Sequence, residues 1–118
     1  MKERIQKMSK LAWDLEDRGK YEDAEKCYSE LLPMMEEVVG QDHPNTLGSK
    51  CNYAATLTAL KKYEEAEKIY VEVIKKSEEV LGANHPRTLA AKGNYANTLR
   101  CLMKFKEAGK IEQEVIRK

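Results

Sequence analysis

The sequence is poor in the residues and segments that are typical of disulfide-rich, membrane-spanning or low-complexity proteins. Its 118 residues include three cysteines, six glycines and three prolines. The cysteines, Cys27, Cys51 and Cys101, are odd in number and none has CxxC spacing, which argues against a disulfide framework and favours a reducing compartment. No apolar run approaches the length of a membrane span, and the charged N-terminus does not resemble a signal peptide. We therefore expect a soluble, cytoplasmic protein.

A charge excess of either sign is also missing. The 21 lysines and arginines are balanced by 20 aspartates and glutamates, which leaves a net charge of +1. Proteins that bind nucleic acids or membrane surfaces usually need a clear basic excess, so we expect neither partner. Because charged residues of both signs are interspersed and make up 35% of the chain, the composition favours solvated helices.

What the sequence does contain is an internal repeat with a period of 42 residues. Between residues 20–61 and 62–103, 23 of 42 aligned positions are identical. The same shift carries the pattern back into the N-terminal segment and forward to the last residues. Apolar residues recur within each repeat at helical spacing, which predicts two helices per repeat. The chain begins at one helix pattern and stops inside another, which is typical of an excised or engineered piece.

Glycine and proline residues mark the predicted ends and starts of these helices. Gly40 and Gly82 fit the left-handed residue that closes a helix, and Pro44 and Pro86 fit the first position of the next one. Pro33 has no proline at the equivalent positions of the other repeats and lies inside a helix pattern. We expect a kink or a break there.

Catalytic and metal-binding constellations are not indicated. The two histidines, His43 and His85, occupy equivalent junctions of successive repeats, which favours N-capping over shared metal ligation. The spacing brings together no nucleophile and base, and there is no glycine-rich phosphate loop. Cys27 aligns with isoleucines and is predicted to be a core residue. We expect no enzymatic activity, no cofactor and no metal.

The repeat resembles a known family in three motifs. They are Tyr53-Ala54-x-x-Leu57, Tyr63-Glu64-Glu65-Ala66-Glu67-Lys68-x-Tyr70, and the linker Leu81-Gly82-x-x-His85-Pro86-x-Thr88. They look like a tetratricopeptide repeat of the longer variety found in kinesin light chains and in NACHT- or NB-ARC-type receptors. This resemblance implies an all-α solenoid of three helix–turn–helix repeats, with six antiparallel helices in a right-handed superhelix. It also implies one domain over residues 1–118, with repeats at approximately 2–43, 44–85 and 86–118.

The resemblance further implies that the first helix of each repeat lines a concave groove that takes peptides or partner proteins. At about 100° per residue, small and amide side chains cluster opposite the apolar stripe of each first helix. The candidate ligand-binding residues are Gln6, Lys10, Trp13, Asn52, Ala55, Asn94 and Asn97. Amides can pair with the backbone of an extended peptide. The alternative is that this side simply faces solvent.

Two members of this set carry further expectations. Trp13 can serve as an apolar anchor for a ligand or pack against the second helix of its own repeat. Lys10 is the only cation in the set, which is too few for a carboxylate clamp, so a chaperone-tail partner is not expected.

Two functions remain open from the sequence. The first is an adaptor that binds a peptide or protein segment in the groove. The second is a self-assembly module that forms a homo-oligomer through its open C-terminal helix, where Ile111, Val115 and Ile116 have no later helix to cover them. Gly109 lies in that helix, so we expect it to fray.

Overall fold

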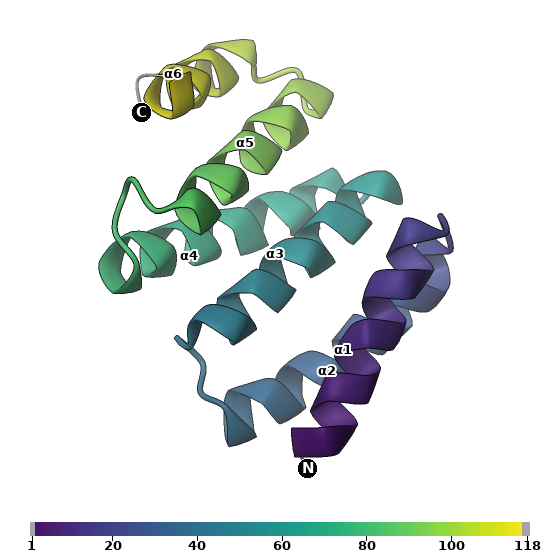
Figure 1. Cartoon of the computed structure of the whole chain (residues 1–118). Coiled ribbons are helices and arrows are strands. Elements are labelled where there is room, and N and C mark those ends of the chain that lie inside the picture. The colour runs from purple at the N-terminus through teal and green to yellow at the C-terminus, as the bar shows by residue number, and fades with distance from the viewer. Residues whose placement is uncertain (1, 117–118) are drawn as a thin grey trace.

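The computed structural model describes residues 2–116, which form six helices and no strand. The helices are α1 (Lys2–Asp17), α2 (Tyr21–Val38), α3 (Pro44–Ala59), α4 (Tyr63–Val80), α5 (Pro86–Cys101) and α6 (Phe105–Ile116). Each helix packs on the next in the chain, and α3 also contacts α1 and α5 (Figure 1). The predicted all-α solenoid of helix pairs is confirmed.

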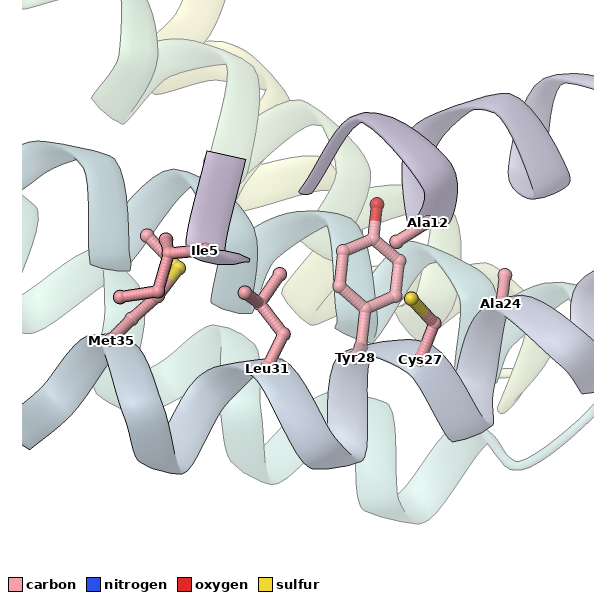
Figure 2. Close-up of a cluster of buried hydrophobic side chains, with 7 residues drawn as sticks. All are labelled: Ile5, Ala12, Ala24, Cys27, Tyr28, Leu31 and Met35. Atoms are coloured by element: carbon pink, nitrogen blue, oxygen red, sulfur yellow. The ribbon is translucent and has the colours of Figure 1, made fainter. Parts of the chain in front are cut away.

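Each helix pair is held by its own apolar cluster. In the first pair, Tyr28, Leu31 and Met35 of α2 face Ile5 and Ala12 of α1 (Figure 2). The predicted core cysteine also belongs to this cluster, because the Cys27 side chain is buried. Alanines without exposed surface recur at the crossings of the later pairs, where only a small side chain lets two helices approach closely.

The junctions between pairs form as the repeat predicts. Gly40 and Gly82 have φ values of +117° and +102°, which favour glycine. His43 caps α3, with its Nδ1 accepting a hydrogen bond from the N–H of Asn45 at 3.1 Å, and Pro44 takes the first helical position. The junction before α5 repeats this arrangement, with His85 as the cap and Pro86 in the first position.

The break expected at Pro33 does not occur. Helix α2 continues through Pro33 to Val38 and is as long as α4, at 18 residues each. Proline removes the N–H that would bond to the carbonyl of Ser29, but Pro33 lies on the exposed side of the helix. Water can therefore satisfy that carbonyl, and packing of the buried face keeps the helix whole.

Buried lysines tie each pair to the next. Lys50 of α3 is only 8% exposed, and its Nζ lies 3.5 Å from carboxylates of both Glu36 and Glu72. The same three positions recur 42 residues later as Lys92, Glu78 and Glu114. Because each lysine reaches a glutamate of the preceding pair and one of its own, the ion pairs fix how successive pairs stack.

Candidate functional site

A depression of about 590 Å³ lies between α1 and α3, close to the loop that joins α2 to α3. Its apolar lining comes from Ile5, Met35 and Val39. Its polar lining consists of Lys2, Gln6, Ser9, His43, Asn45, Ser49, Asn52 and Arg87, with Gly48 beside them. Because an apolar floor with a polar rim can hold a side chain and orient its backbone, this is the strongest candidate site among the described residues.

Two of the predicted ligand residues line this depression. Gln6 extends from α1 and Asn52 from α3, so the structure brings together one amide from each of the first two repeats. Asn94 and Asn97 are exposed on α5 and do not line it. The Nδ2 of Asn94 instead donates to the Sγ of Cys51 at 3.8 Å, across the boundary between repeats two and three.

The other three predicted residues also lie outside the depression. Lys10 is exposed on α1, and Ala55 is half-buried on α3. Trp13 is 57% exposed and does not belong to the core cluster between α1 and α2, so most of its ring is free for contact. These residues extend the candidate surface beyond the depression without forming one pocket with it.

Arg87, His43 and Asn45 line the site although the helical pattern did not select them. His43 lies in the junction before α3, and Asn45 and Arg87 lie in the first turns of α3 and α5. These positions come before the apolar stripe from which the groove residues were chosen. A comparison of equivalent positions offers a weak signal, since Asn45 and Arg87 differ between the conserved pairs His43-Pro44/His85-Pro86 and Thr46-Leu47/Thr88-Leu89.

A polar contact beside the depression joins α1 to α3. The Oγ1 of Thr56 lies 2.6 Å from the Oε2 of Glu16 and 3.0 Å from the carbonyl oxygen of Asn52, so its proton can serve either acceptor. Burial raises the pKa of Glu16, and the hydrogen bond from Thr56 partly offsets that effect. Burial likewise raises the pKa of Tyr28, whose hydroxyl has no partner at hydrogen-bonding distance.

The next boundary uses hydroxyls at the equivalent positions. The Oγ1 atoms of Thr58 and Thr98 lie 2.9 Å apart, between α3 and α5. Thr58 stands 42 residues after Glu16, and Thr98 stands 42 residues after Thr56. The first boundary therefore carries a carboxylate where the second carries a neutral group.

Burial governs the chemistry of two of the thiols, Cys27 and Cys51. The thiol of Cys27 donates to the carbonyl of Met8 at 3.4 Å, and burial raises the pKa of both Cys27 and Cys51. A raised pKa keeps a thiol protonated and poorly nucleophilic. Within residues 2–116, no three histidine, cysteine or acidic side chains gather closely enough to hold a metal ion.

Comparison with known proteins identifies the repeat. Family models described as tetratricopeptide repeat match residues 5–45 and 47–117. The chain belongs to the tetratricopeptide repeat family. Such repeats generally mediate protein–protein interaction, and the family is a non-catalytic kind of scaffold. None of the described helices combines the length and apolar character that crossing a bilayer requires.

Solved tetratricopeptide structures share the fold at low sequence identity. A Podosopora anserina protein described as a kinesin light chain, with nearly identical repeats, superposes with a TM-score of 0.87 at 20% identity, over 97% of this chain and 54% of its own. BtubC (BKLC) of P. vanneervenii gives a TM-score of 0.88 at 20% identity, over 96% of this chain and 44% of its own. The chain thus spans about half the length of these proteins. No curated protein matches it in sequence.

Proposed function

We propose that the chain is a non-enzymatic scaffold that holds an extended peptide or protein segment along α1, α3 and α5. The observation that carries the proposal is the depression of about 590 Å³ between α1 and α3, which Gln6 and Asn52 line together with apolar side chains. An apolar side chain can enter such a site while the amides pair with the N–H and C=O groups of the ligand backbone.

The remaining predicted residues would extend this contact along the same helices. Trp13 offers a large exposed ring that can cover apolar ligand surface at low entropic cost. Asn94 and Asn97 offer further amides on α5, and the small side chain of Ala55 leaves room for a backbone to approach. Lys10 adds a positive charge at the α1 side.

A peptide-library selection with paired variants tests the proposal. Peptides enriched on the parent should bind an Asn52→Ala variant about tenfold more weakly, because loss of one buried hydrogen bond costs about 1–3 kcal/mol. Asn84→Ala makes the same change at an exposed loop position outside the depression and should leave binding unchanged. Absence of enrichment on the parent, or equal binding by both variants, would contradict the proposal.

A second candidate function is self-assembly through the end formed by α5 and α6. It is favoured by Met103 and Phe105, which are 75% and 60% exposed near the start of α6. The molar mass in solution, measured over a wide concentration range, tests this candidate. A mass that rises with concentration and falls on Phe105→Ser substitution would favour assembly, whereas a constant monomer mass would leave the scaffold as the function.

A further inference from the structure

We propose that the depression between α1 and α3 recognises a carboxylate side chain of the bound segment, with Arg87 as its main cationic partner. This inference rests on the proposed scaffold function and adds the chemistry of the ligand. The candidate set chosen from the sequence contains only one cation, Lys10, and that residue does not line the depression. The positive charge comes instead from Arg87 and Lys2.

The charges that line the depression are of one sign. Lys2 and Arg87 contribute cations, and no aspartate or glutamate belongs to the lining. The depression therefore carries a local positive charge, although acidic and basic residues are almost equal in number over the whole chain. A site with cations and neutral donors favours an anion over a cation or a purely apolar group.

Arg87 has no ion-pair partner within the described residues. Arg100, on the same helix, pairs instead with Glu112. An arginine without a carboxylate keeps its donors available to a ligand, and its planar guanidinium can bind both oxygens of a carboxylate. The unpaired state of Arg87 is therefore compatible with a role in recognition.

The Arg87 side chain extends from α5 to α3 at Gly48. The Nη1 of Arg87 lies 4.0 Å from the position that a Cβ on Gly48 would take, so the guanidinium lies beside α3. From α5, Arg87 thus lines both the depression beside α1 and the corresponding hollow between α3 and α5. That second hollow has a volume of only about 20 Å³, which leaves the first as the place where a ligand can enter.

His43 adds a donor whose direction is set by helix capping. Its Nδ1 accepts from the N–H of Asn45, so the neutral ring carries its proton on Nε2. Because His43 also lines the depression, this N–H can complement the guanidinium of Arg87 and the ammonium of Lys2. The equivalent His85 caps α5 in the same way but does not line this site.

A double-mutant cycle between protein and ligand tests the proposal. Peptides selected on the parent should carry an aspartate or glutamate at a fixed position. Replacing that residue by its amide, or Arg87 by glutamine, should each weaken binding about tenfold, because a charged hydrogen bond contributes about 1.5–3 kcal/mol. Making both changes should weaken binding no further, and Arg87→Lys should restore part of the affinity.

Arg18→Gln is the matched control, since it removes an exposed arginine that does not line the depression. It should leave affinity unchanged, and both arginine variants should unfold at the parent's temperature. Selected peptides without a fixed acidic residue, or additive losses in the cycle, would overturn the inference while the scaffold function stands. A parent that enriches no peptide would defeat both. A phosphoserine at the fixed position that binds more tightly than glutamate would overturn the assignment to a carboxylate.

Discussion

Glu16 places a carboxylate at the first boundary between repeats, where the second boundary has the hydroxyl of Thr58. The position is half-buried, so ionisation of Glu16 requires the carboxylate to lose part of its hydration. A hydrogen bond from Thr56 recovers some of that cost. Glu16 therefore destabilises the fold in its charged form, although the contact joins two helices.

Glu16→Gln should make the protein more stable at neutral pH. The pKa of Glu16 is raised on folding, so its contribution to stability is fully present below the ordinary value of 4.5 and is lost as pH rises through the folded pKa. The amide keeps an acceptor for Thr56 and carries no charge to desolvate. Urea denaturation across pH should show a gain that is full at neutral pH and disappears below pH 4.5.

Glu30→Gln provides the comparison for this measurement, because it makes the same change at an exposed position of α2. A gain for Glu16→Gln that persists unchanged at low pH, or that Glu30→Gln reproduces, would contradict the explanation by burial.

At the residue scale, the sequence predicted roles that depend on local geometry and missed those that depend on packing between repeats. The caps at His43 and His85 follow from their place before proline, and both predictions are confirmed. Arg87 was missed because its side chain extends from α5 across Gly48 of α3 toward a depression beside α1. The apolar pattern of a single helix does not predict such a contact between helices of different repeats.

At the scale of the helices, glycines serve two different purposes. Gly82 ends α4 with a φ of +102°, a conformation that other residues rarely adopt. Gly93 lies within α5 without a positive φ, and a Cβ there would meet no atom within 4 Å. The first glycine is required by the backbone, whereas the second only weakens its helix.

Alanine substitution should therefore have opposite effects at these two positions. Gly93→Ala should raise the free energy of unfolding by roughly 0.5–1 kcal/mol, because alanine favours a helix interior. Gly82→Ala should lower it by roughly 1–3 kcal/mol through backbone strain. Chemical denaturation of both variants measures the two changes, and the same sign for both would contradict this assignment.

The order and ends of the helices were predictable because the repeat places the same signals 42 residues apart. Helices α2, α4 and α6 begin at Tyr21, Tyr63 and Phe105, as the repeat requires. At Pro33 local propensity favoured a kink or a break, and no break occurs. There the buried face of α2, which includes Leu31, Leu32 and Met35, packs tightly enough to preserve the helix.

At the scale of the whole molecule, stability should vary along the solenoid. Helices α2 to α5 each pack on two neighbours in the chain, whereas α6 contacts only α5 among the described helices. In a solenoid, the stability of each unit depends on its own helices and on the neighbours it touches. The end at α6 should therefore open more easily than the centre, independently of any ligand.

Hydrogen exchange should show this gradient directly. Amides of α6 should exchange faster than those of α4, since opening α6 disrupts contacts with one neighbour instead of two. Gly109→Ala should slow exchange in α6 by about fivefold, because alanine stabilises a helix interior by about 1 kcal/mol. A Cβ at Gly109 would meet no atom within 4 Å, so the change adds no clash. Equal protection of α4 and α6 in the parent would mean that another surface, such as a second copy of the chain, covers α6.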